Sequence, residues 1–329
     1  MCIRDSTYIG QHPTPLKNSF RILFFEFSGI NIDGGMENIY NGFSRNVNLA
    51  VYRYFKDYGY DKYINGLEEI NSPSGILKYF FKITKNDKIY LLIDEYDHFA
   101  NAILAYSMDD FLTIVGKGGF VRSFYEVLKS ATQTGTLQKM FITGVTPITL
   151  DSLSSGFNIA SNISGREEFN LMAGFSQNEV SYSLENSIFK RCPNINKSEL
   201  LEKIKIWYNG YLFNINAQRR VYNATLVNYF IAQYDYKRCQ MPTKMLDVNV
   251  ASDYRAIMKL FNIGNSQRNY ELLQKLIEDN SIIGTIKDRY DLNHEFSEDD
   301  FLTLIYSMGF ITIKKEAFGE VMELSLIHI

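Results

Sequence analysis

Short apolar runs alternate with stretches of helical periodicity through the first half of the chain. The strand-like runs occupy 20–27, 89–93 and 139–144, and the helical stretches occupy 36–58, 73–84 and 119–132. A continuous apolar run bounded by charge is typical of a central parallel strand that is covered on both faces. Parallel neighbours also need helical crossovers between them. The alternation therefore predicts a doubly wound α/β sheet of parallel strands within residues 7–175.

Helical patterns dominate the second half of the chain. A capping box at 176–179 begins the first of these helices, and further helices are expected to begin at Ser198 and Ser297. The strand-like run at 310–314 suits the start of a wing or hairpin. The sequence thus predicts a mainly α-helical domain over 176–323, with a winged helix as the candidate for its end.

The two ends of the chain read like translations of one transposon mosaic-end adapter on opposite strands. They are MCIRD at 1–5 and LSLIHI at 324–329. Segments of this origin are excluded from fold reasoning, so residues 1–6 and 324–329 are expected to be adapter-derived scars without functional weight. On this interpretation the native sequence is an internal piece of a longer protein, with domains at 7–175 and 176–323.

Composition narrows the classes of function. The chain has 329 residues, a formal net charge of -3 and a pI near 5.9, which give no bulk electrostatic attraction to nucleic acid or anionic membranes. No apolar run approaches the roughly 20 residues that cross a bilayer. Cys192 and Cys239 have neither C-x-x-C spacing nor a nearby histidine pair, so neither a disulfide framework nor a zinc site is predicted. We expect two ordinary thiols in a reducing cytoplasm and no membrane partner.

The candidate chemistry lies where the second apolar run ends. The run IYLLI at 89–93 leads directly into Asp94 and Glu95. A buried parallel strand delivers such acids to the carboxyl edge of its sheet, where ligands bind. Asp94 is placed to orient the shell of Mg²⁺ beside nucleotide phosphates, and Glu95 to accept a proton from the attacking water. Asp97 and His98 are expected to shape the loop. The alternative interpretation is an acidic turn after a buried strand.

Thr143 is the nearest polar residue on the next strand edge, within the run FITGVTP at 141–147. Its hydroxyl is a candidate to contact the γ-phosphate of a nucleotide or to hold the attacking water. Its alternative role is that of an ordinary β-branched strand residue. The functional hypothesis requires Asp94 and Thr143 to lie at the same edge of the sheet. Arg166 is a candidate finger on a neighbouring nucleotide, although a solvated arginine is the simpler interpretation.

The sequence lacks the phosphate-binding loop of a P-loop ATPase. No G-x-x-x-x-G-K-[ST] stretch occurs, because Gly116-Lys117 is followed by Gly118 and lacks the required earlier glycine. That loop supplies backbone N–H groups and a lysine to the phosphates, so this chain by itself is not expected to turn over ATP. The absence of the strand that carries the loop should also leave apolar surface exposed on the sheet.

Several landmarks resemble those of the predicted AAA-ATPase-like proteins of bacteria. They are YIG at 8–10 with PTP at 13–15, FEFSGI at 25–30, LIDEYD at 92–97, ITGVTP at 142–147, FNIA at 157–160, WYNGY at 207–211 and VYN at 221–223. Ala224 stands where that family leads us to expect proline, which loosens only the local turn assignment. The combination is specific and spans nearly the whole native stretch.

The resemblance implies a P-loop NTPase-like parallel sheet that lacks its phosphate-loop strand, followed by the helical domain. In such proteins the phosphate loop lies upstream of Tyr8, and a PD-(D/E)XK nuclease-like domain lies downstream of residue 323. The implied cofactors are ATP and Mg, with Glu95 and Thr143 as catalytic residues, Asp94 as the metal ligand, and both Asp94 and Thr143 in contact with the nucleotide. Nucleic acid is an implied partner only through the missing C-terminal module.

Three functions stay open at this point. An ATP-hydrolysing switch or motor needs Asp94, Glu95 and an upstream lysine. A signalling switch would bind nucleotide tightly and hydrolyse it slowly, whereas a nucleotide-free interaction scaffold would tolerate the loss of both acids. The biological substrate, the oligomeric state and the role of Arg166 are not defined by the sequence.

Overall fold

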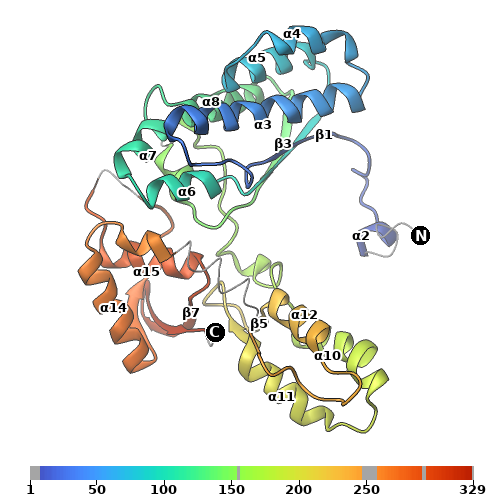
Figure 1. Cartoon of the computed structure of the whole chain (residues 1–329), viewed down its shortest axis with the longest axis vertical. Coiled ribbons are helices and arrows are strands. Elements are labelled where there is room, and N and C mark those ends of the chain that lie inside the picture. The colour runs from blue at the N-terminus through green and yellow to red at the C-terminus, as the bar shows by residue number, and fades with distance from the viewer. Residues whose placement is uncertain (1–7, 154–155, 247–257, 291–293, 328–329) are drawn as a thin grey trace. The chain divides into compact units, whose positions relative to one another are not determined.

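The structure is a computed structural model, and it describes residues 8–153, 156–246, 258–290 and 294–327 (Figure 1). The chain divides into two compact units, Met1–Ala160 and Ser161–Ile329, which we call unit 1 and unit 2.

A parallel sheet forms the centre of unit 1 (Figure 1). Its strands are β1 (Arg21–Glu26), β2 (Ile89–Asp94) and β3 (Leu137–Ile142), in the order β1-β2-β3 with both pairs parallel. All three strands lie where the apolar runs predict them. Because the strands are parallel, their carboxyl ends meet at one edge of the sheet.

Helices precede, connect and follow the three strands. They are α2 (Tyr8–Gln11), α3 (Gly35–Asp57), the 3₁₀ turn η1 (Asp61–Tyr63), α4 (Ile64–Glu68), α5 (Pro73–Ile83), α6 (His98–Leu104), α7 (Met108–Val115), α8 (Phe120–Gln133) and α9 (Ile148–Ser152). The three helices predicted from apolar periodicity are confirmed as α3, α5 and α8. The helices α3 to α5 lie between β1 and β2 in the chain, and α6 to α8 lie between β2 and β3.

The helices cover only one face of the sheet. Leu23 of β1 is fully buried, whereas its neighbours Ile22 and Phe24 are 40% and 45% exposed and Phe141 of β3 is 38% exposed. We call the side that carries these three exposed residues the open face. The expected doubly wound sheet, with helices on both faces, is therefore not found in the described residues. The strand order β1-β2-β3 never reverses direction, so crossovers of the usual right-handed kind all fall on one face.

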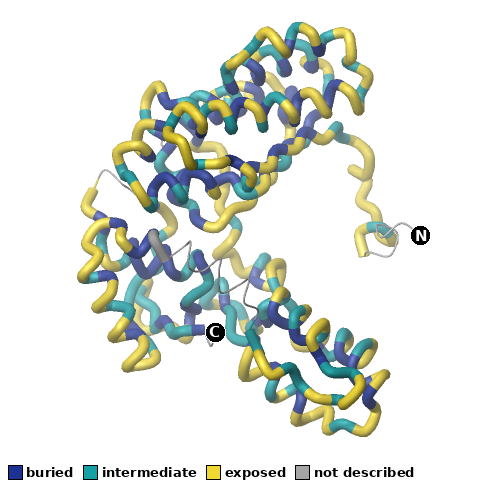
Figure 2. The backbone as a smooth tube through the Cα atoms, in the orientation of Figure 1, coloured by how far each residue is buried: buried dark blue, intermediate teal, exposed yellow. Residues whose placement is uncertain are grey.

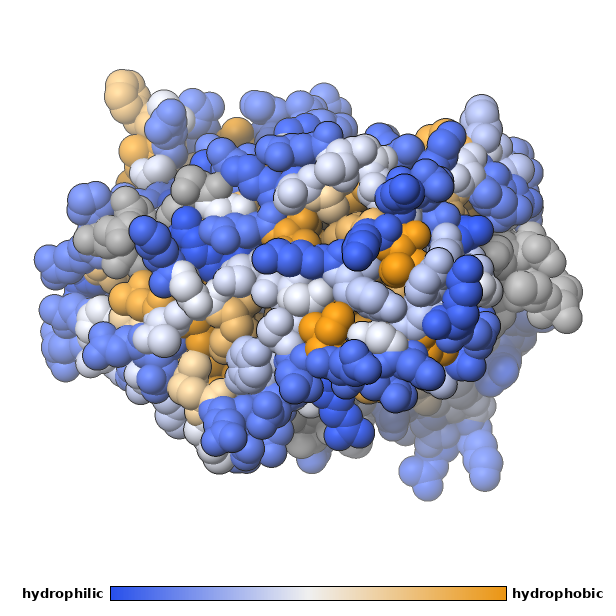
Figure 3. All heavy atoms as spheres, turned by 90° about the horizontal axis from the view of Figure 1, so that it is seen from above, coloured by the Kyte–Doolittle hydropathy of each residue, from blue (hydrophilic) through white to orange (hydrophobic). Residues whose placement is uncertain are grey.

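Aromatic rings fill the core between the sheet and its helices, where Figure 2 shows buried residues along both. Phe27 stacks on Phe43 of α3 with ring centroids 4.8 Å apart. Phe124 of α8 meets Phe25, Phe27 and Phe43 edge to face at 5.4, 5.9 and 5.2 Å. Such edge-to-face pairs add to the stabilisation from area burial. Outside the core, apolar side chains on the face seen in Figure 3 form separate patches between hydrophilic ones.

A polar cluster lies at the amino-terminal edge of the same sheet. Asp87 accepts hydrogen bonds from the hydroxyls of Tyr54 at 2.7 Å and Tyr60 at 2.9 Å, and it pairs with Arg21 at 2.9 Å. The Asp87 side chain is 9% exposed and that of Arg21 is 38% exposed. Burial, reinforced by the Asp87 carboxylate, raises the pKa of Tyr54. The cluster therefore ties α3 to the starts of β1 and β2.

Asp87→Ala should lower the free energy of unfolding of unit 1 by about 2–3 kcal/mol, because three donors lose a largely buried acceptor. The partial exposure of Arg21 keeps the loss below that of a fully buried ion pair. Denaturant unfolding followed by circular dichroism measures the change. As a control, Asp61→Ala removes only the exposed pair with Lys56 and should not move the unfolding midpoint. An unchanged midpoint in Asp87→Ala would contradict this account.

Unit 2 is mainly helical and has short strands. Its elements are η3 (Glu167–Phe169), α10 (Gln177–Leu184), the π-helical turn η4 (Glu185–Phe189), α11 (Lys197–Tyr208), β4 (Asn209–Tyr211), β5 (Val221–Tyr222), α12 (Ala224–Gln233), η5 (Met258–Asn262), α14 (Ser266–Asp279), β6 (Ile282–Thr285), α15 (Glu298–Ser307), β7 (Ile311–Phe318) and β8 (Val321–Leu326). The predicted mainly helical character of this region is thus observed, together with an antiparallel sheet.

The helix starts follow local capping chemistry. Capping boxes begin α10 at Ser176 and α15 at Ser297, as the sequence predicts. The predicted start of α11 at Ser198 is wrong, because Asn196 is its N-cap and accepts the N–H of Glu199 at 3.1 Å. Asparagine and serine cap helices about equally well, so propensity alone does not choose between two neighbouring caps.

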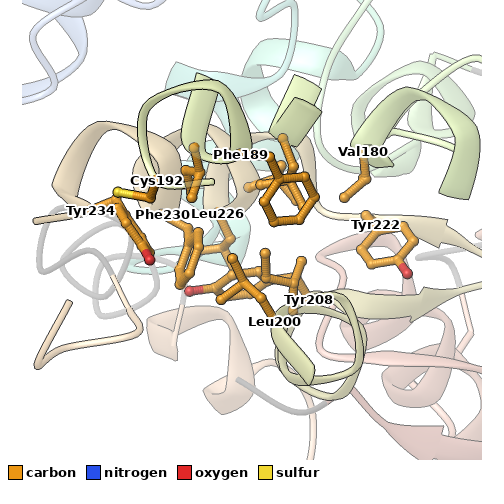
Figure 4. Close-up of a cluster of buried hydrophobic side chains, with 13 residues drawn as sticks. Val180, Phe189, Cys192, Leu200, Tyr208, Tyr222, Leu226, Phe230 and Tyr234 are labelled. Atoms are coloured by element: carbon orange, nitrogen blue, oxygen red, sulfur yellow. The ribbon is translucent and has the colours of Figure 1, made fainter. Parts of the chain in front are cut away.

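A buried cluster packs α10, α11 and α12 together (Figure 4), and a disulfide lies at its margin. Tyr208, Tyr222 and Phe230 are fully buried in this cluster. At its margin Cys192 forms a disulfide with Cys239, with Cα atoms 5.8 Å apart. The prediction of two free thiols is therefore wrong for this structure. The cysteines are 47 residues apart in sequence, and no spacing motif reveals that the turn after α12 returns to the end of η4.

The last elements of unit 2 form an antiparallel sheet in the order β6-β8-β7. The hairpin β7-β8, which turns at Gly319 with φ of +59°, confirms the hairpin expected after residue 310. Helices α14 and α15 pack against this sheet. Strand β8 includes 324–326, which the sequence interpretation assigned to an adapter, and Leu324 is fully buried.

Candidate functional site

The structure brings Asp94 and Thr143 together at the carboxyl edge of the unit 1 sheet. Asp94 is the last residue of β2, and Thr143 directly follows β3. The Thr143 hydroxyl donates a short hydrogen bond to Asp94 Oδ1, and the Thr143 N–H donates to the Ile93 carbonyl at 2.8 Å. Both residues are exposed. The geometry that the sequence hypothesis requires is present, and an incoming ligand can reach both side chains.

Glu95 adopts a left-handed backbone with φ of +50°. This conformation costs a non-glycine residue about 1–2 kcal/mol, and such strain gathers at functional sites. Two hydrogen bonds fix it, from the Glu95 N–H to Asp94 Oδ1 and from the Tyr96 N–H to the Thr143 carbonyl, both at 3.1 Å. The turn leaves the Glu95 side chain 47% exposed, with Oε2 3.6 Å from His98 Nδ1. Glu95 is thus presented to solvent beside the Asp94–Thr143 pair.

Asp97 lies beneath this edge and is fully buried. Its carboxylate accepts the N–H of Val145 at 3.0 Å and the N–H of Thr146 at 2.7 Å. Burial raises the pKa of Asp97, and the hydrogen bonds to the carboxylate act in the opposite direction. These contacts agree with the loop-shaping role expected for Asp97, whereas His98 is exposed.

Glu26 is a further carboxylate at this edge that sequence reasoning missed. It is the last residue of β1, it pairs in register with Asp94, and it is exposed. The N–H of Phe27 donates to the Asp94 carbonyl at 3.2 Å, which fixes the two strand ends side by side. In the sequence, the only signal for Glu26 was a single acid at the end of an aromatic strand. It becomes informative only when the strand register is known.

The donors at this edge fit Mg²⁺ only in company with phosphate and water. Within the described part of the chain, no group of three or more His, Cys, Asp and Glu side chains could hold a metal ion. Mg²⁺ keeps several waters and takes one or two carboxylates from the protein. The exposed Asp94 carboxylate, oriented by the Thr143 hydroxyl and the Glu95 N–H, meets that requirement.

An open hollow of about 460 Å³ lies beside β3. It is lined by Thr132, Gly135 and residues 137–140. Among the described residues β3 pairs only with β2, so its outer edge carries unpaired backbone groups. The Asp94–Thr143 edge therefore adjoins both a free strand edge and the open face.

Arg166 belongs to unit 2 and makes only local contacts among those described. Its Nη2 donates to Ser161 Oγ at 2.6 Å, and its Nη1 lies 3.8 Å from Glu168 Oε1. The side chain is 50% exposed. These contacts are those of a solvated arginine, and they do not test a role for Arg166 at a nucleotide.

A parallel sheet with Asp94, Glu95 and Thr143 at its carboxyl edge is compatible with the core of a P-loop NTPase, a class of nucleotide-binding α/β proteins. Residues 3–154 match the model of the family described as Predicted AAA-ATPase. This match supports a general ATPase-like function and nucleotide binding.

No curated protein and no solved structure matches the chain. Among the described helices none has both the length and the apolar character needed to span a membrane.

Proposed function

We propose that the chain is part of an AAA-type ATPase that binds ATP with Mg²⁺ and hydrolyses it at the carboxyl edge of the unit 1 sheet. The observation that carries this proposal is the hydrogen bond from Thr143 to Asp94, which joins the ends of two neighbouring strands beside the half-exposed Glu95 side chain. Hydrolysis would drive a molecular switch or motor.

Each of the three side chains has a separate task in the proposed reaction. Asp94 would bind the metal, because the Thr143 hydroxyl and the Glu95 N–H already orient one of its oxygens. Bound Mg²⁺ would offset negative charge on the phosphate oxygens. Glu95 would take a proton from the attacking water. Thr143 would orient that water or the γ-phosphate, since its hydroxyl lies on the metal-binding carboxylate.

We place the missing phosphate loop upstream of Tyr8, on a strand that pairs with the outer edge of β3. The free edge of β3, the hollow beside it and the open face support this placement, because a parallel strand needs a neighbour and a helix that covers it. The strand would end at the same edge as Asp94. The phosphates would then meet the N–H groups at the start of the following helix.

For residues 176–323 we propose a helical region that ends in a winged helix. The sheet order β6-β8-β7 beside α14 and α15 supports this assignment. A nuclease-like domain downstream of residue 323 would supply any contact with nucleic acid. We also propose a cytoplasmic location.

The alternative is a signalling or interaction scaffold that binds nucleotide without hydrolysing it. One observation favours it, namely that the Glu95 carboxylate lies 3.6 Å from the His98 ring, which would restrain the proposed base. The two functions differ in turnover but not in nucleotide binding.

The test compares the chain as it stands with the chain extended upstream through its phosphate loop. The chain as it stands should show no ATP hydrolysis above background, because no lysine or N–H cradle holds the γ-phosphate. The extended chain should hydrolyse ATP and require Mg²⁺. Turnover by the unextended chain, or none by an extended chain that contains G-K-[ST], would overturn the proposal.

A further inference from the structure

We propose that Asp97 is a positioning residue of this site, and that its buried carboxylate sets the Thr143 hydroxyl on Asp94. The inference rests on the proposed ATPase function. Asp97 would touch neither ATP nor water, and it would act through the loop that follows β3.

Most hydrogen bonds of the Asp97 carboxylate come from the loop after β3, which is distant in sequence. Val145 donates its N–H to both carboxylate oxygens, at 3.0 and 3.1 Å, and Thr146 donates its N–H to Oδ2 at 2.7 Å. The side-chain amide of Asn101, one turn further along α6, donates to Oδ2 at 2.6 Å. Hydrogen bonds between N–H groups and a carboxylate are stronger than those between neutral groups. The Asp97 carboxylate thus fixes the backbone of the residues just after Thr143.

Asp97 makes these contacts instead of capping its own helix. It occupies the N-cap of α6, yet its side chain does not cap that helix. In the same unit Ser72 and Ser107 cap α5 and α7 in the ordinary way, with the side chain accepting a backbone N–H of the first turn. A cap of this kind contributes about 1 kcal/mol to helix stability. Asp97 forgoes it and directs its charge to the loop of the neighbouring strand.

The loop after β3 is closely packed against Asp97 and Tyr96. A Cβ atom on Gly144 would lie 2.4 Å from Asp97 Oδ1 and 2.3 Å from the ring of Tyr96. Tyr96 closes the other side, since its N–H donates to the Thr143 carbonyl at 3.1 Å and its hydroxyl donates to the Thr146 carbonyl. The segment from Thr143 to Thr146 is therefore fixed at both ends by two consecutive residues of the β2 loop.

This arrangement explains how a loop residue reaches Asp94 with a defined geometry. Thr143 is exposed and follows the last residue of β3, a position where a side chain would otherwise choose among several rotamers. Removal of the Asp97 carboxylate would leave the N–H groups of Val145 and Thr146 without their acceptor. The loop would shift to find new partners, and the Thr143 hydroxyl would leave Asp94.

The first test measures turnover in the chain extended through the phosphate loop. Asp97→Asn should lower kcat for ATP at least about 10-fold and change the KM for ATP less than about 2-fold, because small displacements of a positioned group act mainly on the chemical step. Thr143→Ala should show the same loss. The double variant should be no worse than Thr143→Ala alone, since residues that act through one another are not additive.

A matched control separates positioning from general loss of stability. Asp87→Asn disturbs a partly buried carboxylate cluster of the same sheet at its other edge and should leave kcat unchanged at a temperature where all variants stay folded. Multiplicative losses in the double variant, or a kcat loss in Asp87→Asn equal to that in Asp97→Asn, would overturn the inference. If Glu95→Gln instead retains full turnover, the proposed function itself fails.

A second test needs no turnover and uses the chain as it stands. Amide hydrogen exchange of Val145 and Thr146 should be slow in the unmodified chain and at least about 10-fold faster in Asp97→Ala, because both amides lose their acceptor. The Thr143 amide should also exchange faster, since the loop that follows it is released. Unchanged exchange at all three amides would overturn the inference, whatever the result with ATP.

Discussion

Glu95→Gln in the chain extended through its phosphate loop should reduce ATP turnover by about 10²–10⁴-fold and leave nucleotide affinity nearly unchanged. The amide keeps the shape of the carboxylate but cannot take a proton from the attacking water. The left-handed backbone at Glu95 is fixed by hydrogen bonds from main-chain N–H groups, which the substitution does not remove. Steady-state hydrolysis and equilibrium binding of ATP measure the two effects separately.

Asp94→Asn is the matched variant, because it changes the neighbouring acid in the same conservative way. It should weaken Mg²⁺-dependent nucleotide binding as well as turnover, since Asp94 is the proposed metal ligand. The two acids then separate by phenotype. Unchanged turnover in Glu95→Gln would remove the catalytic assignment, and equal, small effects from both variants would favour the scaffold.

Reduction of the Cys192–Cys239 disulfide should lower the free energy of unfolding of unit 2 by about 2–4 kcal/mol. The cross-link closes a loop whose ends are 47 residues apart, which restricts the unfolded chain. Trp207 is the single tryptophan and lies in α11 of unit 2, so its fluorescence follows this unit alone. Denaturant unfolding with and without a phosphine reductant measures the difference.

The variant in which Cys192 and Cys239 are both replaced by serine is the control for this prediction, and its stability should not respond to the reductant. Thiol titration of the unfolded, unreduced chain should detect one free thiol, that of Cys2, out of three cysteines. Three free thiols in protein purified under oxidising conditions would contradict the disulfide. Such a result would restore the expectation drawn from the sequence.

Apolar periodicity was sufficient to find the central elements of unit 1. The runs at 20–27 and 89–93 predict β1 and β2 to within a residue or two, because both strands are apolar along most of their length. The helix predicted at 119–132 is α8, whose apolar positions pack on the sheet. The open face of the sheet could not be predicted, because it depends on the order in which the strands pair. No single apolar run encodes that order.

The candidate site shows the same division between local and distant signals. Asp94 and Glu95 are visible in the sequence because a strand and two acids are contiguous, and the juxtaposition of Asp94 with Thr143 follows from parallel pairing. Glu26 was missed because it needs the register of β1 against β2. The hydrogen bonds from the β3 loop to Asp97 and the disulfide between Cys192 and Cys239 join residues more than 40 positions apart, and no local pattern encodes them.

We propose that nucleotide and metal bind at the edge formed by Asp94 and Thr143. The most direct measurement is paramagnetic broadening of amide resonances by Mn²⁺ with ATP, in the chain extended through its phosphate loop. Resonances of Glu95, Thr143 and Gly144 should broaden first, while those around Asp87 at the opposite edge of the same sheet should stay sharp. Broadening centred on Asp87, or none at either edge when ATP is bound, would contradict it.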